Sequence, residues 1–214
     1  MHNGHKVLDA GCGFGGTIAS LNEHFTDMEL VGLNIDARQI ERARQQVLPQ
    51  PANRIEFIHG DACELPFEDN SFDRVLAVEC IFHFPDRMRF FEEVRRVLKP
   101  GGRLALSDFV LQPFLMLILP VIKSFSQDKS WYGNANTLYT LKDYRRVSRL
   151  LGFPPPLEQD INANTLPTYA FLETIYQQAN FDLPAARRET LNMALVSRFN
   201  LVKYMVLGFE KPLV

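Results

Sequence analysis

Short apolar runs and amphipathic helical patterns alternate along the first half of the chain. The apolar runs, each long enough for a buried strand, fall at residues 7–10, 29–34, 55–58, 72–79 and 103–109. Helical spacing of apolar residues falls between them, at 17–25, 36–47 and 86–98. This alternation predicts βα units and therefore a mostly parallel sheet covered by helices.

Capping residues mark the ends of the predicted helices. Asp36 is a good N-cap, and Gln39 three residues later would complete a capping box. Asp86 is placed to cap the next helix, and the Lys-Pro-Gly-Gly run at 99–102 is typical of a helix end. These signals fix the boundaries between strands and helices in the first half.

The second half follows a different pattern. Residues 110–140 are irregular and rich in aromatic and apolar side chains. A helix is predicted at 141–151 and a short strand near 157–161, and two further helical patterns precede a final strand at 203–210. The pattern therefore predicts one α/β core with an insert after its fifth strand.

The composition excludes several classes of function. Of the 214 residues, 46% are hydrophobic and 22% are charged, and the net charge of -2 gives no general attraction to nucleic acid. The most apolar stretch, 109–125, is interrupted by prolines, so no membrane span is predicted. Three cysteines lack metal-ligand spacing, so we expect reduced thiols in a cytoplasmic protein and no metal site: Cys12, Cys63 and Cys80.

A glycine-rich loop at residues 9–16 joins the first predicted strand to its helix. Glycines there permit a tight turn and close approach of the backbone to a ligand. Gly11 and Gly13 fit the dinucleotide pattern G-x-G-x-x-G together with Gly16, and they fit G-x-G-x-G together with Gly15. The loop alone therefore indicates a nucleotide-like ligand without choosing between the two patterns.

Three segments together decide between these patterns. Residues 7–15 resemble motif I of class I S-adenosylmethionine-dependent methyltransferases. Gly-Asp-Ala at 60–62, followed by Leu-Pro-Phe at 65–67, is similar to the adenine-contacting segment of that family, and residues 98–102 resemble the turn before its fifth strand. The resemblance covers roughly residues 6–109. It implies a Rossmann-like, doubly wound α/β fold with a mostly parallel sheet, an antiparallel last strand and a helical insert or lid.

The resemblance also implies S-adenosylmethionine as cofactor, with S-adenosylhomocysteine as product. Residues 1–109 would form the cofactor-binding core, 110–140 the acceptor-binding insert, and 141–214 the rest of the core. The implied cofactor-binding residues are Asp9, Gly11, Cys12, Gly13, Gly15, Asn34, Ile35, Gln39, Asp61, Ala62 and Glu79. Asp9 would face the cofactor's ammonium group or fix the loop, Asp61 would accept from the adenine amino group, and the Ala62 backbone would read the ring edge.

One position departs from the family pattern. Most members end the second strand with an acidic residue that grips both ribose hydroxyls, whereas this chain has Asn34. Subfamilies that methylate sterols, lipid chains or sugars use a nearby glutamine, which would match Gln39. Gln39 thus has two interpretations, as a ribose ligand and as part of the capping box, while Asp36 is interpreted as the cap alone.

Candidate chemistry lies after the fourth and fifth strands, where ligands sit in open α/β sheets. The stretch from Glu79 to Val110 resembles small-molecule methyltransferases of natural-product pathways, including sugar O-methyltransferases of the rebeccamycin type. That resemblance implies His83 as the base and Asp108 as the assisting residue near the acceptor hydroxyl. His83 could instead pack between its phenylalanine neighbours, Asp108 could anchor a loop, and Glu79 could hold the cofactor or a loop backbone.

The insert would supply the acceptor pocket, or its side chains would simply form the subdomain core. The aromatic and apolar residues in question are Phe114, Leu115, Met116, Phe125, Trp131, Tyr132 and Tyr139. Relatives usually carry an N-terminal helical cover ahead of the first strand. Here such a cover is expected to precede the given sequence, to be absent, or to come from another subunit.

The predicted function is methyl transfer from S-adenosylmethionine to oxygen or nitrogen of a small apolar or aromatic acceptor. The partners expected are this small molecule and a second copy in a homo-oligomer. Carbon methylation of a prenyl, sterol or quinone-like acceptor is an alternative. A catalytically silent cofactor-binding partner subunit is another, and an NAD-dependent oxidoreductase is the most remote.

Overall fold

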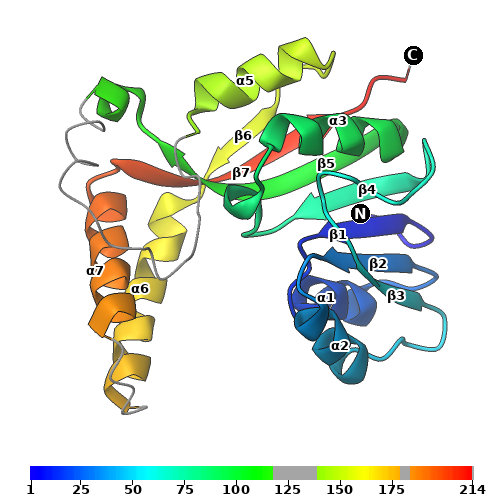
Figure 1. Ribbon diagram of the computed structural model, residues 1–214, viewed down its shortest axis with the longest axis horizontal. Helices are drawn as coiled ribbons and strands as arrows, with labels where there is room; N and C mark the ends of the chain where they lie inside the picture. Colours follow the sequence, from blue (N-terminus) through cyan, green and yellow to red (C-terminus); the bar gives the residue numbers. More distant parts are fainter. Residues whose placement is uncertain (118–138, 179–183, 214) are drawn as a thin grey trace.

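The computed structural model describes residues 1–117, 139–178 and 184–213. The elements are β1 (Lys6–Ala10), α1 (Gly16–His24), β2 (Glu29–Asn34), α2 (Ala37–Gln46), β3 (Arg54–His59), β4 (Phe72–Ala77), η1 (Ile81–His83), α3 (Arg87–Val97), β5 (Leu98–Leu111), η2 (Pro113–Leu117), α5 (Leu141–Leu150), β6 (Leu157–Asp160), α6 (Asn162–Gln178), α7 (Pro184–Arg198) and β7 (Val202–Glu210) (Figure 1).

The strands form one seven-stranded sheet in the order β3-β2-β1-β4-β5-β7-β6. Strands β1 to β5 pair in parallel, whereas β7 runs antiparallel to both β5 and β6. The order reverses at β1, because β2 lies on one side of it and β4 on the other. In such sheets the crevice at the carboxyl ends of the strands, beside the reversal, is the usual place for a ligand.

Two hydrophobic clusters cover the two faces of the sheet. Along β1, Val7 belongs to the cluster that packs under α1 and α2, whereas Leu8 belongs to the cluster under α3 and α5. Neighbouring strand residues point to opposite faces, so this split places the two helix pairs on opposite sides of the sheet. Both faces are buried, which explains why the strands read as continuous apolar runs.

The helical pair α6 and α7 projects away from the body of the sheet (Figure 1). Asn162 at the start of α6 ties the pair together, because its Nδ2 donates to the Ser197 carbonyl on α7 at 2.8 Å. Within the described ranges, none of the helices has the length and apolar character needed to cross a membrane.

The predicted fold class is confirmed, including the antiparallel last strand. The N-cap at Asp36 is also confirmed, since its side chain accepts from the Arg38 amide at 2.9 Å. The predicted capping box is wrong, because the Gln39 side chain accepts from Asn34 at 2.7 Å instead. The fourth strand ends at Ala77, earlier than predicted. The predicted pocket residues Phe125, Trp131 and Tyr132 lie outside the described residues.

Candidate functional site

The glycine loop after β1 has a backbone that only glycine adopts readily. Gly11, Gly13 and Gly15 have φ values of 83°, 54° and 83°. A Cβ at Gly11 would lie 2.7 Å from the Cβ of Cys80, so no side chain fits there. The amide of Gly11 donates to the Leu33 carbonyl at 2.7 Å, which ties the loop to the end of β2.

Gly13 faces open space, since the nearest atom that a Cβ there would meet is Gln39 Oε1 at 3.9 Å. A ligand can therefore approach the backbone between the glycine loop and the start of α2. Gln39 Oε1 in turn accepts from Asn34 Nδ2, so the two amide side chains form one unit at the end of β2. Such a pair presents both a hydrogen-bond donor and an acceptor, which is the chemistry that ribose hydroxyls need.

Asp9 is the buried carboxylate of this region. It is 1% exposed, and neither of its oxygens makes a hydrogen bond of normal geometry among the described residues, although the Thr17 side chain favours its ionised form. Burial raises the pKa of this carboxyl to about 7. An unpartnered buried carboxylate beside a glycine loop fits a ligand with a cationic group, such as the ammonium group of S-adenosylmethionine.

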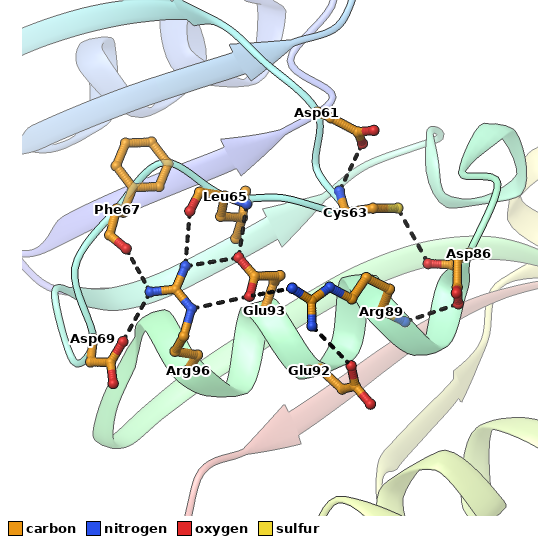
Figure 2. Close-up of polar contacts among 10 residues, drawn as sticks. All are labelled: Asp61, Cys63, Leu65, Phe67, Asp69, Asp86, Arg89, Glu92, Glu93 and Arg96. Atoms are coloured by element: carbon orange, nitrogen blue, oxygen red, sulfur yellow. Dashed lines mark hydrogen bonds and ion pairs between the residues drawn. The ribbon is translucent and has the colours of Figure 1, made fainter.

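The segment after β3 presents Asp61 and Ala62. Asp61 is half-buried, and its Oδ1 accepts from the Cys63 amide at 2.8 Å, which closes a tight turn (Figure 2). Ala62 is buried beneath this turn. Ile35, which follows β2, is 67% exposed, and its carbonyl oxygen lies 3.0 Å from Nε2 of His59 at the end of β3.

His83 lies in the short 3₁₀ turn η1, which follows the end of β4. His83 is exposed, and the centroid of the Phe82 ring lies 4.5 Å from that of its imidazole. Partial burial lowers the pKa of His83, so the imidazole is mostly neutral at pH 7. A neutral imidazole at the ligand edge of the sheet is able to accept a proton.

Glu79, two residues after the end of β4, has a left-handed backbone with φ of 53°. Its Oε1 accepts from the Tyr204 hydroxyl at 2.6 Å, and that hydroxyl lies 3.0 Å from Ser107 Oγ. The Glu79 amide donates to the same Ser107 Oγ. This unit joins the ends of β4 and β5 to β7. The sequence pattern did not indicate Tyr204, which is 125 residues from Glu79 in the chain.

Asp108 is buried in an ion pair within the protein. Its Oδ2 lies 2.5 Å from Arg87 Nη1 and accepts from the Tyr144 hydroxyl at 2.5 Å, and its Oδ1 accepts from the Phe109 amide. The Arg87 and Asp108 side chains are 1% and 0% exposed. Burial raises the pKa of Asp108, and the Arg87 guanidinium opposes that rise. Among the described residues, Asp108 thus pairs with Arg87, Tyr144 and the Phe109 amide, and not with His83.

Arg87 also stacks on Tyr139, with its guanidinium carbon 4.3 Å from the ring centroid. Tyr139 is the first described residue after the gap at 118–138. Of the other predicted pocket residues, Phe114 is 56% exposed and Leu115 is buried. Arg87 therefore joins the start of α3 to Asp108 on β5. It also joins α3 to Tyr139 and Tyr144, which lie just before and within α5.

Comparison with known proteins places this arrangement in a family. A family model described as a methyltransferase domain matches residues 8–106. Methyltransferase GfsG of Streptomyces halstedii is 36% identical over 77% of this chain and 58% of its own length. The 27-O-demethylrifamycin SV methyltransferase of Amycolatopsis mediterranei is 33% identical over 99% of this chain and 79% of its own length. The chain belongs to the S-adenosylmethionine-dependent methyltransferases.

Membership of the methyltransferases removes the NAD-dependent oxidoreductase from the alternatives. The sterol 24-C-methyltransferase erg6 of Aspergillus fumigatus is 41% identical over 52% of this chain and 29% of its own length. Oxygen and carbon methyltransferases therefore both occur among the relatives. The chain spans 58% of the first relative's length and 29% of the sterol enzyme's.

Solved structures show the same fold. The crystal structure described as that of "a putative sarcosine dimethylglycine methyltransferase" from Galdieria sulphuraria superposes with a TM-score of 0.79 over 99% of this chain and 80% of that one, at 22% identity. The cofactor of this methyltransferase family is S-adenosylmethionine, and the unpartnered Asp9 carboxylate and the open backbone at Gly13 fit its amino-acid part. These features make the crevice beside β1 the candidate cofactor site.

Proposed function

We propose that this methyltransferase acts on an oxygen or nitrogen acceptor of a small apolar or aromatic molecule, with His83 as the base. The observation that carries the proposal is the mostly neutral, exposed imidazole of His83 at the carboxyl end of β4. Bound S-adenosylmethionine supplies a methyl group that is already activated for transfer. The protein's own task is then to position the acceptor and to remove its proton.

The cofactor would be held at three places. Asp9 pairs with the ammonium group, and the glycine backbone at Gly11, Gly13 and Gly15 gives room for the amino-acid part. The Asn34–Gln39 pair binds the ribose hydroxyls. Asp61 accepts from the adenine amino group, and the Ala62 amide donates to the ring.

Asp108 would assist without touching the acceptor. It neutralises Arg87, and Arg87 follows the turn that carries His83. In this role Asp108 is a positioning residue, because it fixes the start of α3 and the return of the insert through Tyr144. The proton taken up by His83 passes to solvent on its open side.

Carbon methylation is the second candidate. It is supported by the similarity to the sterol 24-C-methyltransferase over 52% of this chain and by Glu79. A carbon acceptor develops positive charge when it is methylated, and the exposed Glu79 carboxylate would offset that charge. In that reaction the base at His83 would matter less than Glu79.

His83→Gln tests the proposal after turnover has been found with a panel of aromatic, glycosylated and prenyl acceptors. We expect kcat to fall about 100-fold or more, since general base catalysis contributes about 10²–10⁴ in rate. In the unchanged protein kcat/KM should fall as the pH drops through the His83 pKa, which lies below 6.5. His24→Gln is the matched control, because His24 ends α1 and hydrogen-bonds the Ser20 carbonyl.

Other outcomes would redirect the assignment. Near-normal turnover by His83→Gln, together with loss of turnover in Glu79→Gln, would favour the carbon acceptor. Saturable binding of S-adenosylhomocysteine without turnover of any acceptor would contradict both candidates and favour a cofactor-binding subunit.

A further inference from the structure

The irregular segment between β3 and β4 is held by one helix rather than by a strand. The Leu65 amide donates to Glu93 Oε2 on α3 at 2.8 Å, and the Leu65 carbonyl accepts from Arg96 Nη2 at 2.8 Å (Figure 2). Both backbone groups of one loop residue are therefore satisfied by two side chains of α3. Arg96 also donates through Nη1 to the Phe67 carbonyl at 2.6 Å.

Glu93 and Arg96 are themselves locked together. Arg96 Nη2 and Nε donate to Glu93 Oε2 and Oε1 at 2.8 and 3.1 Å, a two-pronged pair one turn apart on α3. The Glu93 side chain is 8% exposed and that of Arg96 is 31% exposed. Hydrogen bonds from Arg96 lower the pKa of Glu93, so the carboxylate stays ionised at neutral pH. An exposed ion pair contributes little to the free energy of unfolding. This pair, however, also forms hydrogen bonds with three backbone groups of the loop.

The other end of the segment is fastened to the same helix. Cys63 Sγ lies 3.3 Å from the carbonyl oxygen of Asp86, and Asp86 caps the start of α3. The Cys63 amide donates to Asp61 Oδ1, so the position of the Asp61 carboxylate follows that of Cys63 (Figure 2). Residues 61–67 thus lie on α3 between two attachments, at Asp86 and at the Glu93–Arg96 pair.

We propose that the Glu93–Arg96 pair is a positioning device for adenine recognition, which sets the selectivity of the cofactor site for a 6-aminopurine over a 6-oxopurine. The inference rests on the proposed role of Asp61 and Ala62. The 6-amino group donates to the Asp61 carboxylate, and the ring nitrogen beside it accepts from the Ala62 amide. A 6-oxo group reverses both partners. Selectivity therefore depends on how firmly the 61–67 segment is held against α3.

Arg96→Met removes every hydrogen bond that the guanidinium makes to the loop and leaves a side chain of similar length. Calorimetric titrations with S-adenosylhomocysteine and with S-inosylhomocysteine measure affinity and purine selectivity in the same sample. We expect the affinity for S-adenosylhomocysteine to fall about tenfold and that for the inosyl analogue to change much less, so the selectivity ratio shrinks about tenfold. Amide hydrogen exchange at Leu65 should also become faster.

Arg95→Met is the matched control, since Arg95 is the exposed neighbour on the same helix. It should leave both affinities and the Leu65 exchange rate unchanged. Arg96→Lys keeps the charge but cannot reach both carbonyls and Glu93 together, so it should give an intermediate ratio. If Arg96→Met does not fold, the same titrations are made with Arg96→Lys.

Three results would overturn the inference. An equal loss of affinity for both ligands in folded Arg96 variants would mean that the pair stabilises the fold without selecting the purine. An unchanged ratio would mean that the segment holds its place without α3. Failure of the unchanged protein to bind S-adenosylhomocysteine would instead remove the proposed cofactor site, and the inference with it.

Discussion

Two aspartates of the same sheet, Asp9 on β1 and Asp108 on β5, are both buried, but they differ in their hydrogen-bond partners. Asp9 is 1% exposed and makes no hydrogen bond of normal geometry among the described residues, whereas Asp108 is fully buried against Arg87 and Tyr144. A buried carboxylate without a partner is costly, so it is kept only where something else supplies its partner. On the proposed assignment Asp9 pairs with the ammonium group of the cofactor, whereas Asp108 pairs with Arg87 inside the protein.

The same difference separates two regions of the site. The region around β1 and β2 consists of open backbone and amide side chains, with its one buried carboxylate unpaired. The region around β5 and α5 is closed by charge pairing and aromatic stacking. On the proposed assignment the cofactor completes the first region, whereas the buried charges of the second region are paired within the protein.

The largest effect is expected for Asp108→Asn. This change keeps the volume but removes the carboxylate charge that lies 2.5 Å from the buried Arg87 Nη1. Breaking one side of a buried ion pair costs about 3–5 kcal/mol in the free energy of unfolding. Urea unfolding monitored by circular dichroism measures this loss. A change below about 1 kcal/mol would contradict the structural role of the pair.

Asp9→Asn should give the opposite pattern. The free energy of unfolding at pH 8 should stay the same or rise, since an unpaired buried charge is removed. Affinity for S-adenosylhomocysteine should fall by about 10- to 100-fold, because a hydrogen bond to a charged group is worth about 1.5–3 kcal/mol. Urea unfolding measures the change in stability, and calorimetry on the same preparation measures the change in affinity. A loss of stability with unchanged affinity would place Asp9 with Asp108 as a structural residue.

The smallest effect is a proton release. The pKa of Asp9 is about 7 in the free protein, so at pH 7 part of the protein carries a neutral carboxyl. A bound ammonium group favours the ionised form, so binding expels a proton and affinity rises as the pH increases through 7. Binding enthalpies in buffers with different ionisation enthalpies count these protons. Release that persists in Asp9→Asn would assign them to another group.

The local features of the chain were predictable from sequence because they depend on neighbours along it. The strands and the caps at Asp36 and Asp86 follow from short-range patterns. Gln39 was placed correctly on its helix, but its side chain turned to Asn34, since a strand-end amide competes with the cap. A capping box does form at Thr140 and Asp143.

The partnerships across the sheet were not predictable in the same way. Tyr144 reaches Asp108 from 36 residues away, and Tyr204 reaches Ser107 from 97. These contacts depend on β7 lying beside β5 and on α5 packing above it, which no local pattern encodes. A buried arginine within a run of basic residues also gives no sequence signal, so the local pattern does not indicate that Arg87 is buried.

The position of β7 has a consequence for how the protein is made. Its residues, Val202–Glu210, fill the gap between β5 and β6, although both of those strands leave the ribosome earlier. Until β7 is synthesised, the facing edges of β5 and β6 have unpaired backbone groups that other chains can pair with. Chaperones would be needed most in that interval. Variants that slow the docking of β7 should therefore lower the yield of protein in the cell more than they lower the stability of the protein once folded.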